Sequence, residues 1–71
     1  MIGYIYNTDT RVIATKIEDV QKCNDTTIKS DSAMAKIGTG QYNITDQIFH
    51  EGDILSEGIT DRRSEIPVLD E

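Results

Sequence analysis

The fold class follows from residues 2–17, which read IGYIYNTDTRVIATKI. Alternation places Ile2, Tyr4 and Tyr6 on one face of an extended chain and Gly3 and Ile5 on the other, which is the two-residue period of a β-strand. Residues 7–10 are Asn-Thr-Asp-Thr, whose short polar side chains bond to nearby backbone and favour a turn. The stretch therefore predicts an opening β-hairpin with strands at 2–6 and 11–17.

The second strand of this hairpin carries apolar groups on both sides. Strict alternation puts Val12 and Ala14 on one side and Ile13, Thr15 and Ile17 on the other. Apolar residues on both sides of a hairpin indicate that each face is covered.

The amino-acid composition extends the β prediction to the whole chain. Eleven Ile and eight Thr against two Leu and three Ala favour strands, because β-branched side chains lose rotamer freedom in helices and pack well on a pleated surface. We expect an all-β protein, a small antiparallel hairpin and meander or a partly open barrel, with at most one short helix.

Further along the chain the pattern predicts short strands at 26–29 and 41–49 and a tight turn at 38–40. Residues 33–37 are read as a strand, the alternative being a short helix with Ser32 as N-cap and Gly38 after its end. Residues 18–25 are read as a connection, although Ile17, Val20 and Cys23 could line one helical turn.

Residues 1–71 make a single small domain with a marginal core, since a chain of this length buries only about 60% of its unfolded surface. Cys23 has no second cysteine to pair with, and a structural zinc site needs about four ligands where the sequence offers one His. We therefore expect a homo-oligomer. The acidic tail, residues 60–71, is expected to be ordered by a partner subunit through Ile66, Val68 and Leu69.

The net charge of −6 disfavours duplex nucleic acid as a partner, because binding it needs cations that displace counterions. The charge fits either plain solubility or an acidic face that meets a basic host protein. The N-terminus lacks the basic region of a signal peptide, and no apolar run approaches the ~18 residues of a spanning helix. We expect no membrane contact and a place in the host cytoplasm.

No residue set points to an enzyme, a metal or another cofactor. His50 to Asp53 is the one cluster of imidazole and carboxylates, but a catalytic metal normally takes three protein ligands, so a polar turn is the simpler interpretation. Cys23 lies beside Lys22 without a nearby base in the sequence and is read as an inert thiol.

Several residues could contact an anionic ligand. Backbone N–H groups of the 38–40 turn could hold a phosphate, or the turn could simply join two strands. The doublet at 62–63 could bind phosphate or carboxylate, or pair with Asp61 and Glu65. Tyrosines on the first strand could stack on a base, or pack in the core. The predicted ligand-binding residues are Tyr4, Tyr6, Arg11, Gly38, Thr39, Gly40, Arg62 and Arg63.

Residues 3–14, GYIYNTDTRVIA, resemble the start of short uncharacterised bacteriophage accessory proteins, which open with a hairpin of this kind and end in an acidic tail. The resemblance implies a minor virion component or a small counter-defence factor. Among the latter, some are compact oligomers that sequester nucleotide immune signals, and others are acidic proteins that block a host nuclease.

The resulting functional prediction is a non-enzymatic binding protein of phage counter-defence that holds a small anionic ligand, such as a nucleotide immune signal, at a subunit interface. The alternatives are an acidic inhibitor that occupies a basic groove of a host enzyme, and a minor structural protein of the virion.

Overall fold

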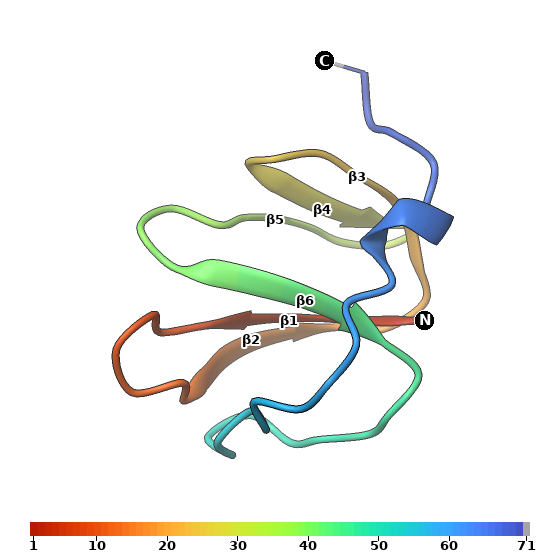
Figure 1. Ribbon diagram of the computed structural model, residues 1–71. Coiled ribbons are helices and arrows are strands. Elements are labelled where there is room, and N and C mark those ends of the chain that lie inside the picture. Colours follow the sequence, from red (N-terminus) through yellow and green to blue (C-terminus); the bar gives the residue numbers. More distant parts are fainter. Residues whose placement is uncertain (71) are drawn as a thin grey trace.

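The computed structural model describes residues 1–70 and confirms an all-β protein (Figure 1). Its regular elements within these residues are strands and a single turn of 3-10 helix. They are β1 (Ile2–Tyr6), β2 (Ile13–Ile17), β3 (Val20–Cys23), β4 (Thr27–Ser30), β5 (Met34–Lys36), β6 (Gln41–Thr45) and η1 (Arg63–Glu65).

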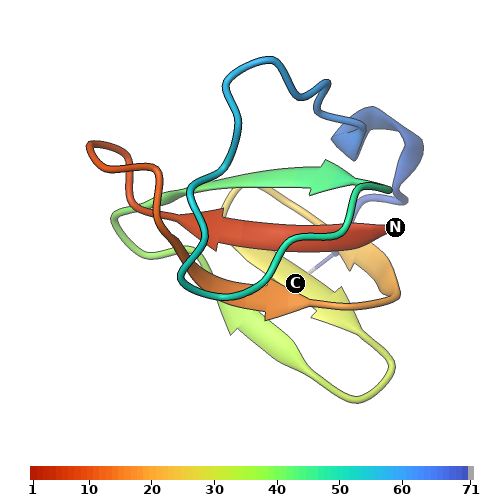
Figure 2. The ribbon, with the colours of Figure 1, turned by 90° about the horizontal axis from the view of Figure 1, so that it is seen from below.

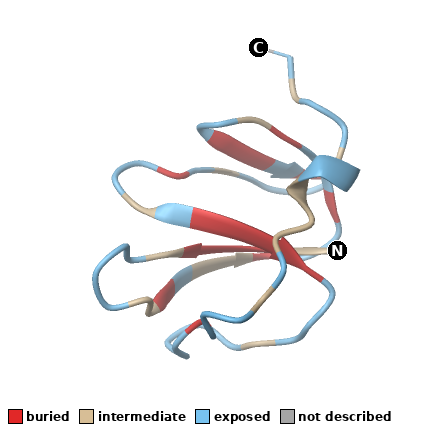
Figure 3. Ribbon diagram, viewed as in Figure 1, coloured by how far each residue is buried: buried red, intermediate tan, exposed pale blue. Residues whose placement is uncertain are grey.

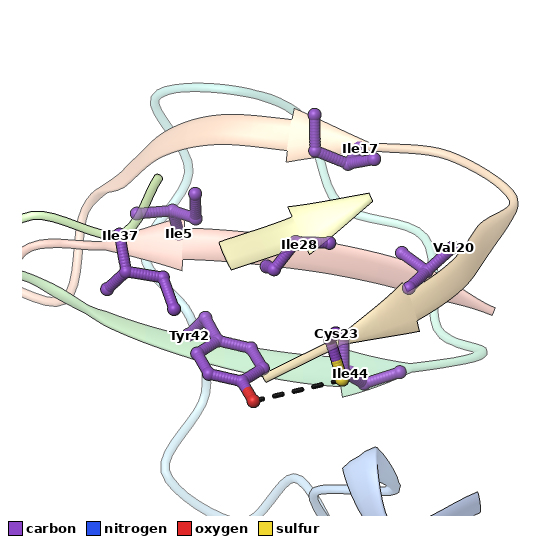
Figure 4. Close-up of a cluster of buried hydrophobic side chains, with 8 residues drawn as sticks. All are labelled: Ile5, Ile17, Val20, Cys23, Ile28, Ile37, Tyr42 and Ile44. Atoms are coloured by element: carbon purple, nitrogen blue, oxygen red, sulfur yellow. Dashed lines mark hydrogen bonds between the residues drawn. The ribbon is translucent and has the colours of Figure 1, made fainter. Parts of the chain in front are cut away.

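The strands form two antiparallel sheets, ordered β2-β1-β6 and β3-β4-β5. The two sheets pack face to face, and Figure 4 shows their apolar side chains meeting between the layers. Buried residues concentrate on the central strands β1 and β4 and on β6 (Figure 3). This main core consists of Ile5, Ile17, Val20, Cys23, Ile28, Ile37, Tyr42 and Ile44.

The strand β1 is covered on both faces, as its alternation predicts. Ile5 belongs to the main core between the sheets, whereas Tyr4 lies in a second buried cluster with Ile13 and Leu55. The loop of residues 46–60 crosses the outer face of the first sheet and covers this second cluster (Figure 2). A chain with few apolar residues thus buries them in two layers.

Gly3 lies where the first sheet packs closely against β3 and β4 of the second sheet. A Cβ atom on Gly3 would lie 3.1 Å from Val20 Cγ2 and 3.2 Å from two side-chain carbons of Ile28. A side chain at this position would force Val20 and Ile28 to shift by a few tenths of an ångström, so glycine favours the close packing of the sheets here.

The predicted placement of Ile13 and Ile17 on one side of the second strand is wrong. Thr15 pairs with Ile5 but Ile13 pairs with Tyr6, so a β-bulge at Ala14 shifts the register. The extra residue reverses the alternation. Ile17 therefore enters the main core and Ile13 enters the cluster under the loop.

Two other predicted boundaries need correction. Residues 18–25 contain the strand β3 rather than a plain connection or a helical turn, because Asp19 adopts a positive φ of 54° and reverses the chain tightly after β2. The strand predicted at 41–49 ends at Thr45. Within the predicted strand at 33–37, residues 34–36 form β5, and 38–40 forms the expected turn.

The tail is held by its own chain. Arg62 N donates to Ile44 O at 2.8 Å, and Cys23 donates to Pro67 O and accepts from Leu69 N at 3.1 and 2.9 Å. The tail thereby covers the outer edges of β6 and β3 (Figure 1). These contacts order residues 62–69 within one chain, while the ordering by a partner subunit stays a prediction. Val68 pairs with Cys23 through its backbone, and its side chain is 72% exposed.

Candidate functional site

Tyr4, one of the predicted ligand-binding residues, lies in the buried core. Its side chain is fully buried, and its hydroxyl donates to Gln47 O at 2.7 Å and accepts from Phe49 N at 2.8 Å. Its ring meets Phe49 edge to face, with the centroids 5.4 Å apart. Tyr4 thus fastens the 46–60 loop to the first sheet and presents nothing to a ligand.

Tyr6 and Arg11 lie together at the other end of the opening hairpin. The guanidinium carbon of Arg11 stands 5.0 Å from the centre of the Tyr6 ring, within cation–π range. Its Nε and Nη2 donate to the carbonyls of Leu55 and Ser56 at 2.9 and 3.1 Å. The cation is therefore used to hold the loop against the hairpin.

A hollow of about 400 Å³ lies beside Tyr6 and brings it together with Thr39 and Gly40 of the predicted set. Its charged lining residue is the carboxylate of Asp9, which repels an anion. Gly40 has a packing role, since a Cβ there would lie 2.6 Å from Tyr6 O, and Gly38 has a positive φ of 65° that suits the turn.

The doublet Arg62-Arg63 lies elsewhere, against β6, and engages the acidic residues beside it. Arg62 pairs with Glu65 through two bonds of 2.7 and 2.9 Å and with Asp46. Arg63 pairs with Asp61, donates to Tyr42 O at 2.6 Å and stacks 3.9 Å above the Tyr42 ring. The fold thus separates the eight predicted residues instead of joining them in one pocket.

Beneath Arg63, Tyr42 and Cys23 border a second hollow of about 260 Å³. The Tyr42 hydroxyl donates to Asn24 O at 3.0 Å and lies 3.8 Å from Cys23 Sγ (Figure 4). Burial raises the pKa of Tyr42 to about 12, and the bond to Cys23 adds to this effect. A phenol of this kind stays protonated at neutral pH and serves as a hydrogen-bond donor, not as a base.

The His50 to Asp53 segment is a polar turn, as expected. The backbone N–H of His50 donates to Asp53 Oδ2 at 2.9 Å, and Asp53 N donates to His50 O. Within residues 1–70, no three His, Cys, Asp or Glu side chains are grouped as a metal ion would need.

Three lysines on the second sheet were not among the predicted ligand-binding residues. Lys22 of β3 pairs directly with Lys29 of β4, and Lys29 pairs directly with Met34 of β5. Their strand neighbours Cys23, Ile28 and Ala35 point into the core, so these three side chains point outward by alternation. Lys36 follows two residues after Met34 on the same side. We call Lys22, Lys29 and Lys36 the lysine face.

All three side chains of the lysine face are exposed, and none makes an ion pair among the described residues. The fourth lysine, Lys16, differs, because it pairs with Glu18 at 3.5 Å. Lys22 and Lys29 stand opposite each other, an arrangement that costs stability because like charges repel across a strand pair. The sequence held a signal for this face, namely three lysines spaced seven residues apart through a run of short strands.

Comparison with known proteins gives no relative from which to transfer a function: no protein-family model, curated protein or solved structure matches the chain. No helix among residues 1–70 has the length and apolar character needed to cross a membrane.

Proposed function

We propose that this chain is a non-enzymatic binding module that holds an anionic partner on the lysine face. The observation that carries the proposal is the direct pairing of Lys22 with Lys29 on an exposed sheet surface, with Lys36 beside them. In a chain with net charge −6, three of the four lysines gather on one face while carboxylates predominate over the whole molecule.

The three arginines are already held by contacts within the fold, which favours the lysine face over them as the anion-binding surface. Arg62 and Arg63 are paired with carboxylates, and Arg11 is bonded to loop carbonyls. An incoming anion would have to break those contacts to reach them. The lysine face offers ammonium groups that need no such rearrangement, and each is a mobile donor on a long stem.

The repulsion between Lys22 and Lys29 lowers the stability of the fold, and this effect can be used to test the proposal. Replacing Lys29 by Gln removes a repulsion, so the K29Q variant should be as stable as the parent protein or more stable, by about 0.2–1 kcal/mol. The same change should weaken anion binding. A residue whose removal improves the fold and impairs binding is typical of a functional surface.

The experiment compares K29Q and the triple variant K22Q/K29Q/K36Q with the control K16Q, whose lysine is ion-paired. Melting temperature is followed with inorganic tripolyphosphate, polyglutamate and a cyclic dinucleotide as probes, since any ligand of the folded state raises it. We expect at least one probe to stabilise the parent protein and K16Q but not the triple variant. Absence of a shift with all probes, or an equal shift in the triple variant, would refute the proposal.

The phage origin, the counter-defence role and the homo-oligomer stay predictions from the sequence. Among the probes, the cyclic dinucleotide addresses the nucleotide-signal form of the proposal directly. Light scattering of the purified protein addresses the oligomer.

A further inference from the structure

Among residues 1–70, no segment pairs with the outer edge of β5, whereas other chain segments cover β6, β3 and the start of β2. The outer edge of β6 is covered by residues 61–62, that of β3 by residues 67–69, and the start of β2 by residues 52–55. Strand β5 is the last strand of its sheet and pairs only with β4 in the described chain.

The backbone groups at this edge can be identified from the pairing. Ala33 O accepts from Ser30 N, and Ile37 N donates to Thr26 O, both at 2.8 Å, so the odd-numbered residues of this strand face β4. In an antiparallel pair the orientation alternates from residue to residue. The N–H and C=O groups of Met34 and Lys36 therefore point away from β4, toward the side of β5 on which no other strand pairs in the described chain.

The side chains beside this edge select what could bind there. Met34 is 62% exposed, and it lies between Lys29 across the pair and Lys36 along the strand. A strand added to β5 would bring its side chains next to Met34 and Lys36. Lys29 lies one strand farther away on the same face, where a long side chain from the added strand could meet it. Lysine at a sheet edge discourages pairing with apolar strands. It does not discourage a strand that carries carboxylates.

We propose that β5 accepts an extended acidic segment of a partner protein as an additional antiparallel or parallel strand, with its carboxylates on the lysine face. This inference rests on the proposed function and names the class of ligand. Backbone hydrogen bonds to Met34 and Lys36 provide the general affinity, and the lysines provide the selection.

Two other occupants are disfavoured by the same geometry. A second copy pairing through its own β5 would place the two Lys36 residues at the shared edge and the two lysine faces in one continuous sheet, which adds repulsion. Nucleic acid has no strand backbone to complete the ladder, and the net charge of −6 opposes it.

The probe is a short capped peptide of alternating glutamate and valine, labelled for fluorescence anisotropy. One control peptide carries methyl groups on successive central backbone nitrogens, which keeps its charge and removes its ability to pair. Another control replaces glutamate by lysine. We expect binding of the first peptide, weaker binding of the methylated peptide by about tenfold or more, and no binding of the lysine peptide.

The matched protein variants are Met34→Pro and Met34→Ala. Proline at this position removes an outward N–H and no bond to β4, and edge strands accept proline. Met34→Pro should weaken binding by about tenfold, and Met34→Ala by less. Amide hydrogen exchange gives a second readout that needs no variant, because the peptide should protect the Met34 and Lys36 amides of the parent protein.

The outcomes separate this inference from the proposed function. If the glutamate peptide binds with equal affinity when methylated, and the two amides gain no protection, strand addition is wrong while anion binding on the lysine face stands. If no peptide binds but tripolyphosphate does, strand addition is again wrong and anion binding on the lysine face again stands. If no anionic probe of any kind binds, both proposals fail together. Dimerisation that grows with concentration and protects the same amides would show a second copy at this edge and overturn the inference.

Discussion

Removing one buried oxygen atom should loosen the loop that covers the first sheet. The Tyr4 hydroxyl makes two hydrogen bonds, to Gln47 O at 2.7 Å and from Phe49 N at 2.8 Å. In the variant Tyr4→Phe both backbone groups lose this partner. At about 1 kcal/mol for each bond, and more where a buried group is left without a partner, the variant should lose about 2–3 kcal/mol of unfolding free energy.

The matched control is Tyr6→Phe, because Tyr6 lies on the same side of β1 and its hydroxyl has no hydrogen bond among the described residues. Urea denaturation measures the free energy of unfolding of both variants, and thermal melting should show a fall of roughly 10 °C or more for Tyr4→Phe alone. Amide exchange at residues 47–49 should also quicken. Equal stability of the two variants would refute the argument that Tyr4 fastens the loop.

Three further results are expected. Gly3→Ala should lose about 1–3 kcal/mol on urea denaturation, because the new Cβ would meet side chains of the second sheet at 3.1 Å, whereas Gly58→Ala has open space and should change little. Arg63→Ala should lower the melting temperature more than Arg62→Ala. Arg63 stacks on the buried Tyr42 ring and donates to the Tyr42 backbone carbonyl, whereas Arg62 makes exposed ion pairs. A larger drop in melting temperature for Arg62→Ala would contradict this. Burial raises the pKa of Tyr42 from 10 to about 12, so its contribution to stability is complete below pH 10 and is lost as the pH rises toward 12; Tyr42→Phe should flatten that alkaline part of the pH–stability curve.

Part of the fold could be predicted because it depends on local signals. The alternation of residues 2–6, the Asn-Thr-Asp-Thr turn and the apolar groups on both sides of the hairpin predicted strand β1, the return of the chain and the cover on both faces. The bias toward Ile and Thr predicted the all-β class. These properties follow from backbone preferences and side-chain period, which neighbouring residues determine by themselves.

The site could not be predicted in the same way, because it depends on contacts between distant residues. Arg11, Arg62 and Arg63 were expected to bind an anion, but the loop carbonyls, Asp61 and Glu65 engage them in the folded chain. For Arg62 and Arg63, the nearby acidic residues in the sequence already suggested such a pairing. For Arg11 they did not. The bonds of Arg11 span 44 and 45 residues of sequence, and no local pattern reports them.

What the sequence determined by itself is therefore the strand-forming character of the chain, its opening hairpin and its acidic excess. The bulge at Ala14, the internal anchoring of the tail, and the meeting of Lys22, Lys29 and Met34 on one surface exist only in the folded chain. They depend on strand register, because a single extra residue turns every later side chain to the opposite face of a strand. Which face and which partner each residue receives is settled only when the strands pair across the whole fold.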